Sequence, residues 1–213
     1  MKKLEIIFDI SYLCIVIVVG IRLLNTGAVW NRLYGIMALV LGGGDACHLV
    51  PRIYFLWQNG IVKKSPFLGA GKFITSITMT VFYLMLYKIY FLYYGVKEDI
   101  TFTGLLYILA GLRMILCLLP QNRWLTEDGE IRWKIYRNIP FIFIGFLVFY
   151  LFFALPLEQA GVFHYMWLAI FLSYACYLPV VLGAHKYPKL GMLMLPKTCA
   201  YIWMLLMALH VSN

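Results

Sequence analysis

The chain has little charge for its length. Of its 213 residues, 13% are charged, and only 9 are Asp or Glu against 18 Lys or Arg. Hydrophobic residues make up 63% of the sequence, and the mean hydropathy is +0.85. A water-soluble domain needs more polar surface than this. The composition therefore excludes a soluble enzyme or binding module and indicates an integral membrane protein.

The sequence also lacks the paired cysteine spacing of disulfide frameworks and metal sites. Its five cysteines stand singly inside apolar runs, and they are Cys14, Cys47, Cys117, Cys176 and Cys199. We therefore expect small buried thiols, with no disulfide, no metal and no other cofactor. The net charge of +9 is not arranged as a basic stripe with interleaved aromatics, which argues against nucleic acid as a partner.

Long apolar runs dominate what is present. A helix that crosses a bilayer needs about 20 apolar residues. Such runs can be placed over about 4–24, 33–50, 71–94, 102–119, 139–157, 162–184 and 190–211. The apolar residues are continuous and do not alternate, which argues against strands. We expect a single all-α domain over residues 1–213, a polytopic transmembrane bundle of about seven helices.

The basic residues are distributed unevenly between the two sides of these runs. With a cytoplasmic N-terminus, the cytoplasmic segments hold Lys2, Lys3, Arg52, Lys63, Lys64, Lys72, Arg123, Arg132, Lys134, Arg137, Lys186 and Lys189. The outer segments hold only Arg22, Arg32 and Lys97. Because Lys and Arg favour cytoplasmic loops, we predict a cytoplasmic N-terminus and an external C-terminus.

Asp45 is a carboxylate at the end of the second apolar run, directly after Gly42, Gly43 and Gly44. A charge at membrane depth is costly and usually marks a functional site. The glycines allow another segment, a lipid or a water to approach closely. The other polar residues that the predicted orientation brings to a similar depth are Asp9, His48, Ser76, Arg113, Ser173, Tyr174 and Lys197. We expect them to converge on a pocket that opens toward the cytoplasmic leaflet.

Several of these residues also have a structural interpretation. Asp9 and Lys197 can snorkel to the interface or pair with neighbours, and Arg113 can be a buried ion-pair partner. His48 follows Asp45 by three positions, so the two side chains are close enough to hydrogen-bond. Asp9, Asp45 and His48 are too few and unsuitably spaced for a metal site.

Residues 44–52, Gly-Asp-Ala-Cys-His-Leu-Val-Pro-Arg, resemble the Gly-Asp…Leu-x-Pro signature of the YhhN family, membrane proteins that include lysoplasmalogenases. The glycine-led segment 71–76 and the late segments 171–174 and 198–201 are also similar to that family. The resemblance implies a hydrolase of the bacterial cell membrane that cleaves the vinyl ether of a lysophospholipid. The family usually has eight helices, one more than the runs counted here.

The resemblance also implies roles for individual residues. Asp45 would act in acid–base catalysis with His48 to orient it. The family's expected His and late-helix Asp correspond here to Ile77 and Tyr174, and Asp9 would replace that Asp. Burial favours the protonated form of a carboxyl group, which suits an acid that protonates an enol ether. The expected substrate-binding residues are Arg113, Lys197, Ser76, Ser173 and Tyr174.

A different class of function is also compatible with the sequence. A non-catalytic lipid-binding or transport protein would use Asp45 and Arg113 as a structural or proton-linked ion pair. A structural scaffold is a third alternative. For both the hydrolase and the lipid-binding or transport protein, the expected partner is a membrane lipid or a lysophospholipid.

Overall fold

The computed structural model describes residues 2–59, 65–126, 129–156, 158–184 and 186–211. Across these residues the chain is helical without strands, and seven helices are long and apolar enough to cross a membrane. They are α1 (Lys2–Leu24), α2 (Val29–Asn59), α3 (Pro66–Tyr94), α4 (Ile100–Leu118), α5 (Ile131–Phe153), α6 (Met166–Gly183) and α7 (Met194–Met207). The short 3₁₀ helices are η1 (Pro120–Asn122), η2 (Gly161–Phe163), η3 (Pro188–Leu193) and η4 (Ala208–Val211). The predicted transmembrane helical bundle is confirmed.

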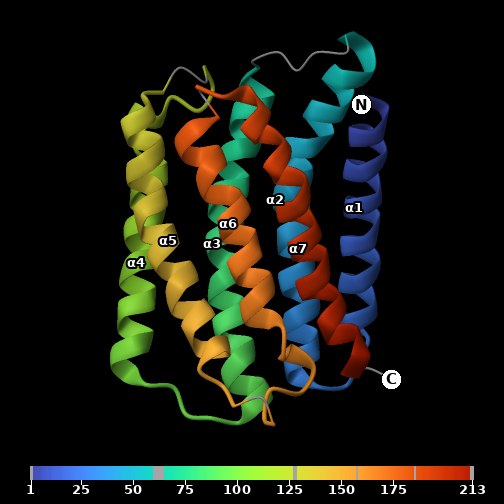
Figure 1. Cartoon of the computed structure of the whole chain (residues 1–213), viewed down its shortest axis with the longest axis vertical. Coiled ribbons are helices and arrows are strands. Elements are labelled where there is room, and N and C mark those ends of the chain that lie inside the picture. Colours follow the sequence, from blue (N-terminus) through green and yellow to red (C-terminus); the bar gives the residue numbers. More distant parts are fainter. Residues whose placement is uncertain (1, 60–64, 127–128, 157, 185, 212–213) are drawn as a thin grey trace.

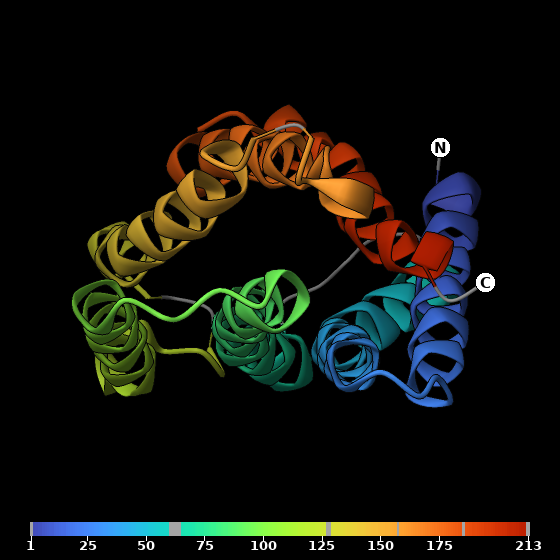
Figure 2. The same cartoon turned by 90° about the horizontal axis from the view of Figure 1, so that it is seen from below.

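The seven helices form a closed, flattened ring. Figure 1 shows them side by side along one axis, with the chain's two ends at opposite ends of the bundle. In Figure 2, α4, α3 and α2 stand in one row, and α5, α6 and α7 form an arc that faces it. Each helix contacts the next along the chain, and α7 closes the ring against α1.

Three helices, α2, α3 and α5, extend further than the apolar runs predict, and α3 begins at Pro66 where residue 71 was expected. The second run was expected to end at residue 50, but α2 continues through Pro51 to Asn59. The fifth was expected to begin at residue 139, but α5 begins at Ile131 and contains Pro140. Transmembrane helices tolerate internal proline because neighbouring groups satisfy the freed carbonyls. As a result Arg52 and Arg137, both expected in loops, lie on helices. Lys63 and Lys64 lie outside the described residues.

Aromatic side chains fill the core between the helices. The largest fully buried side chains include Tyr12, Tyr34, Phe82, Tyr83, Tyr87, Phe141 and Phe163. Buried hydroxyl groups need partners, and the Tyr34 hydroxyl donates to the Met204 carbonyl at 2.5 Å, which ties α2 to α7. The expectation of buried cysteines is wrong for Cys14, Cys47 and Cys199, which are exposed on the surface of the bundle.

Close contact between α2 and α3 positions the candidate site. A Cβ added at Gly44 would lie 1.9 Å from the Thr78 hydroxyl, and one at Gly71 would lie 2.2 Å from the Cys47 carbonyl oxygen. The Thr75 hydroxyl donates to the Gly44 carbonyl at 2.8 Å. Gly44, directly before Asp45, thus admits α3, which fixes the turn of α2 that carries Asp45.

Candidate functional site

A cavity of about 300 Å³ lies between α1, α2, α3 and α7. Its polar walls include Asp9 of α1, Asp45 and His48 of α2, and Lys197 of α7. We call it the acidic compartment, because the carboxylates of Asp9, which is buried, and Asp45, which is half-buried, both line it. The predicted convergence of these four residues is therefore observed, although they lie far apart in the sequence.

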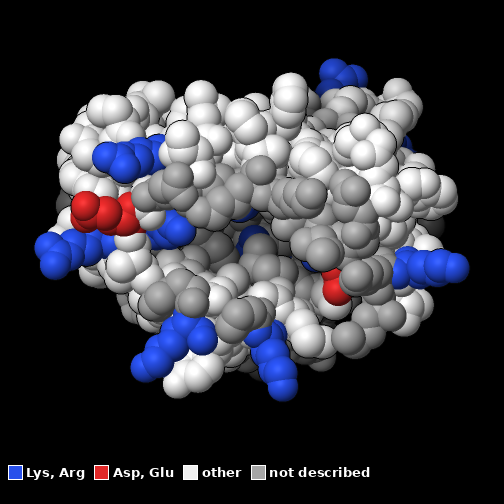
Figure 3. Space-filling model, turned by 90° about the horizontal axis from the view of Figure 1, so that it is seen from above, with Lys and Arg blue, Asp and Glu red and all other residues white. Residues whose placement is uncertain are grey.

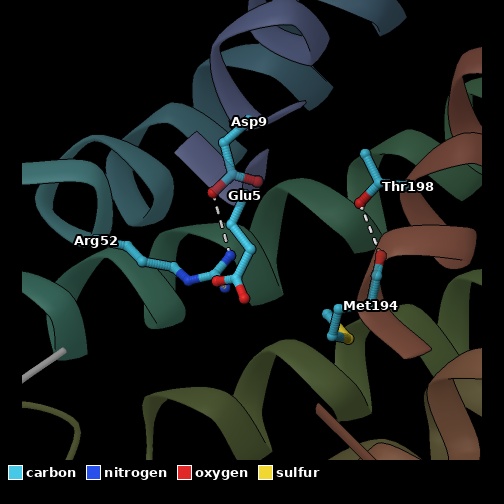
Figure 4. Close-up of polar contacts among 5 residues, drawn as sticks. All are labelled: Glu5, Asp9, Arg52, Met194 and Thr198. Carbon is cyan, nitrogen blue, oxygen red and sulfur yellow. Dashed lines mark hydrogen bonds and ion pairs between the residues drawn. The ribbon is translucent and has the colours of Figure 1, made fainter. Parts of the chain in front are cut away.

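The two carboxylates of the acidic compartment have different partners. Asp45 accepts a hydrogen bond of 2.5 Å from the Tyr12 hydroxyl. Asp9 is 3.1 Å from Arg52, which also binds Glu5 at 3.0 Å. Figure 4 shows the Arg52 guanidinium reaching the two carboxylates of α1, with the Met194 and Thr198 turn of α7 nearby. Asp9 is thus held by a cation and Asp45 by a phenol.

A larger cavity, of about 620 Å³, adjoins the acidic compartment between α3, α4, α5, α6 and α7. His48, Lys72, Thr75, Met194 and Lys197 line both cavities. The basic residues on the walls of the larger one are Lys72, Arg113, Lys134, Arg137 and Lys197, and we call it the cationic chamber. Figure 3 views the bundle from the end where α1 begins. It shows a hollow there, with Lys and Arg side chains inside and around it.

Arg113 is the most deeply buried cation of the chamber, with 2% of its surface exposed. Its guanidinium carbon lies 3.4 Å from the centre of the Phe141 ring. Within the described part of the chain, its Nε and Nη1 have no hydrogen-bond partner. Because buried donors are normally paired, each exception needs an explanation.

Two expected pairings are absent. The proposed Asp45–Arg113 pair does not form, because Asp45 binds Tyr12 and Arg113 stacks on Phe141. The expected hydrogen bond between Asp45 and His48 is also absent, and the buried His48 Nδ1 has no partner among the described residues. The two positions lie on one helix, but the Tyr12 hydroxyl reaches the carboxylate from α1 instead.

The three hydroxyl residues predicted to bind substrate have separate surroundings. Ser76 lines the cationic chamber, and its hydroxyl donates to the Lys72 carbonyl at 2.8 Å. Ser173 and Tyr174 do not line either cavity, so their predicted contact with substrate is not supported. Tyr174 donates to the Phe141 carbonyl at 2.9 Å, and Ser173 is buried. Tyr174 therefore supports the ring on which Arg113 lies.

Several site residues were not predicted from the sequence. Tyr12, Arg52, Lys134, Arg137 and Tyr177 were either interpreted as loop charges or not singled out. Arg52 follows Asp45 by seven positions, a spacing that places both on one helix face. That signal was present, but the second helix was expected to end at residue 50, before Arg52. Arg137 donates to the Asn122 side-chain oxygen at 2.7 Å and lies over Trp124.

The residues that the structure describes hold no cluster of three or more His, Cys, Asp or Glu side chains able to bind a metal ion. No protein-family model, curated protein or solved structure matches the chain. The site must therefore be interpreted from its own geometry.

Proposed function

We propose that the protein is a membrane-embedded hydrolase of the lysoplasmalogenase type, which cleaves the vinyl ether bond of a single-chain glycerophospholipid. The observation that carries this proposal is the pair of carboxylates, Asp9 and Asp45, on the walls of one compartment that adjoins a cationic chamber. Paired carboxylates in different environments can divide acid and base roles. The resemblance of residues 44–52 to the YhhN family supports the same reaction.

The two carboxylates suit the two halves of this reaction. Asp45 has a neutral hydrogen-bond donor and gives its proton to the vinyl carbon farther from the ether oxygen. The adjacent carbon becomes an oxocarbenium ion, and the Asp9 carboxylate, which pairs with Arg52, stabilises that positive charge. Water adds to the cation and returns a proton to Asp45. The resulting hemiacetal splits into a fatty aldehyde and the free glycerol hydroxyl.

The remaining polar groups suit the headgroup. Lys197 lines both cavities, so a phosphate beside it has its glycerol near the acidic compartment. Lys197 Nζ lies 5.0 Å from the centre of the Tyr201 ring and 5.1 Å from that of Tyr177. Arg113 and Lys197 bind the phosphate in this proposal, and His48 lies at the junction of the two cavities.

The proposal includes a location and an orientation. The site faces the cytoplasmic leaflet of a bacterial cell membrane, with the N-terminus inside and the C-terminus outside. The uneven distribution of basic residues supports this orientation, and the hollow lies at the basic end of the bundle.

Release of fatty aldehyde from a 1-alkenyl lysolipid by the purified protein in detergent tests the reaction. The Asp45→Asn variant should lose activity by about a hundredfold or more, because an amide cannot deliver the proton. The matched control is Glu98→Gln, which makes the same chemical change at an ion pair with Lys88 away from both cavities. An Asp45→Asn variant that is as fast as wild type contradicts the catalytic role.

The same experiment separates catalysis from binding. A non-catalytic lipid-binding protein would be stabilised against thermal unfolding by the lysolipid without releasing aldehyde. The structure does not support a lipid-binding protein that uses an Asp45–Arg113 ion pair. Asp45 contacts Tyr12 and Arg113 contacts Phe141 instead.

A further inference from the structure

The cationic chamber is lined by basic residues without an acidic one among its described walls. Its five basic residues come from four helices, and the carboxylates of Asp9 and Asp45 belong to the adjoining compartment. A concave, partly dehydrated site with charge of one sign attracts ligands of the opposite sign. The ligand group that occupies this chamber should therefore carry net negative charge.

The unpaired atoms of Arg113 indicate which anion fits. Its Nε and Nη1 donors are buried without partners among the described residues, although the side chain lines the chamber. Guanidinium groups bind carboxylates and phosphates through two parallel hydrogen bonds. Leaving such donors unpaired costs free energy. A phosphate in the chamber would give this guanidinium the anionic partner that it lacks among the described residues.

The aromatic faces near the chamber are already covered by cations. Arg113 lies 3.4 Å from the centre of the Phe141 ring, and Arg137 lies 3.9 Å from that of Trp124. The Lys197 ammonium lies 5.1 Å from the centre of the Tyr177 ring. Proteins bind choline and similar ammonium groups on open aromatic faces. Because basic side chains occupy these rings, a ligand ammonium would meet positive charge.

We propose that the cationic chamber binds a phosphomonoester and discriminates against zwitterionic headgroups such as phosphocholine and phosphoethanolamine. A phosphomonoester carries a charge of about −1.5 to −2 at neutral pH, which five basic residues can neutralise. A phosphocholine adds a cation that has no acidic partner among the described chamber walls. The proposed substrate is therefore a single-chain glycerol lipid with a terminal phosphate.

This inference rests on the proposed function in treating the two cavities as one substrate site. It is tested with lipids that cannot be cleaved, so the two proposals can fail separately. The probes are a saturated 1-O-alkyl glycerol 3-phosphate and the 1-O-alkyl glycerophosphocholine of the same chain length, which lack the vinyl ether. Inorganic phosphate is the third probe. Dissociation constants are measured from the ligand-dependent shift in the Tm of the full chain in a neutral detergent.

The wild-type protein should bind the phosphomonoester lipid at least about tenfold more tightly than the phosphocholine lipid, which corresponds to about 1.4 kcal/mol. Equal binding of the two lipids would overturn the proposal. Weak binding of inorganic phosphate supports a lipid as the source of the phosphate. Binding of inorganic phosphate as tight as that of the lipid supports free phosphate as the ligand of the same chamber.

Variants of Arg113 locate the preference in the chamber. Arg113→Gln should abolish the difference between the two lipids, and Arg113→Lys should retain part of it, because it keeps the charge but loses the planar fork. The matched control is Arg32→Gln, which removes an exposed guanidinium that donates to the Thr26 carbonyl. An Arg113→Gln protein that folds and keeps the full preference contradicts the proposal. If Arg113→Gln does not fold, Arg113→Lys is the test: a reduced preference supports the proposal, and a preference equal to that of the wild type contradicts it.

Failure of catalysis has a different signature. A protein that prefers the phosphomonoester but releases no aldehyde from any 1-alkenyl lipid would contradict the proposed reaction. The same result would still support a phosphomonoester as the ligand of the cationic chamber. A protein that releases aldehyde from the alkenyl phosphocholine as fast as from the alkenyl phosphomonoester, with equal affinities for both, would contradict the headgroup assignment and leave the reaction standing.

Discussion

At the residue scale, the site depends on how each carboxylate of the acidic compartment is partnered. Asp45 accepts from the Tyr12 hydroxyl, which is itself 1% exposed, while Asp9 pairs with Arg52. Removing one partner of a buried polar pair leaves the other without compensation for its lost hydration. Tyr12 does not need to touch substrate to affect the reaction, since it fixes the direction in which Asp45 points.

The variant Tyr12→Phe tests this positioning role. It removes the hydrogen bond but keeps the ring, so kcat for vinyl ether cleavage should fall at least about tenfold, the equivalent of a charged-group hydrogen bond of about 1.5–3 kcal/mol. KM should change little, because Tyr12 does not line either cavity. The measurement is steady-state aldehyde release in detergent.

The matched control is Tyr34→Phe, which removes a hydroxyl of similar burial that donates to the Met204 carbonyl instead. Tyr34→Phe should lower the Tm without lowering kcat. If the two variants affect kcat equally, Tyr12 acts only through stability.

Residue types and helix depth predicted one pocket for eight polar residues, and four of these line the acidic compartment. Asp9, Asp45, His48 and Lys197 were placed at a similar depth, and the structure brings them to one cavity. Their pairing could not be predicted in the same way. It depends on the rotation of each helix about its axis, and in a membrane core rich in apolar residues on every face, hydrophobic periodicity does not determine that rotation.

At the element scale, the contact between α2 and α3 determines where Asp45 and His48 lie. Small residues let helix backbones approach closely in membranes, and Gly44 and Gly71 are the points of closest approach between these helices. Not every glycine of the run has this role. A Cβ at Gly43 would meet nothing within 4 Å.

This difference predicts that alanine has opposite effects on stability at Gly71 and at Gly43. In Gly71→Ala, the added Cβ would lie 2.2 Å from the Cys47 carbonyl oxygen, so the helices must separate. The expected loss in free energy of unfolding is about 1–3 kcal/mol, typical of overpacking. Gly43→Ala should instead be neutral or stabilising by up to about 1 kcal/mol, because alanine favours the helix.

Thermal unfolding in detergent measures both effects, and aldehyde release shows whether the Gly71→Ala change also disturbs the site. Similar Tm values for the two variants would contradict the close packing of α2 on α3.

The ends of the elements were harder to predict than their existence. Apolar runs indicated all seven helices, but the second run was expected to end at residue 50 and the fifth to begin at residue 139, whereas α2 continues through Pro51 to Asn59 and α5 begins at Ile131. Inside a bundle, neighbouring helices can satisfy the carbonyls that proline leaves free, so the helix continues. Because these helix ends were placed wrongly, Arg52 and Arg137 were counted as loop charges and were missed as site residues.

At the scale of the whole molecule, charge is concentrated at one end of the ring. The hollow with its Lys and Arg side chains lies at the end where α1 begins (Figure 3), and the chain's other end lies at the opposite end of the bundle (Figure 1). Positive charge favours the cytoplasmic side and also attracts anionic lipid headgroups there. Orientation therefore determines which leaflet supplies the proposed substrate.

Labelling of single cysteines in intact cells tests this orientation. In a background without the five native cysteines, Glu130→Cys places a thiol at the exposed start of α5, at the basic end, and Lys97→Cys places one in the exposed loop after α3, at the other end. A membrane-impermeant maleimide should label Lys97→Cys in intact cells and Glu130→Cys only after the membrane is opened. Permeabilised cells, in which both thiols must react, are the control for accessibility. The reverse pattern would place the mouth of the cationic chamber on the outer leaflet and would contradict a cytoplasmic source for the lipid.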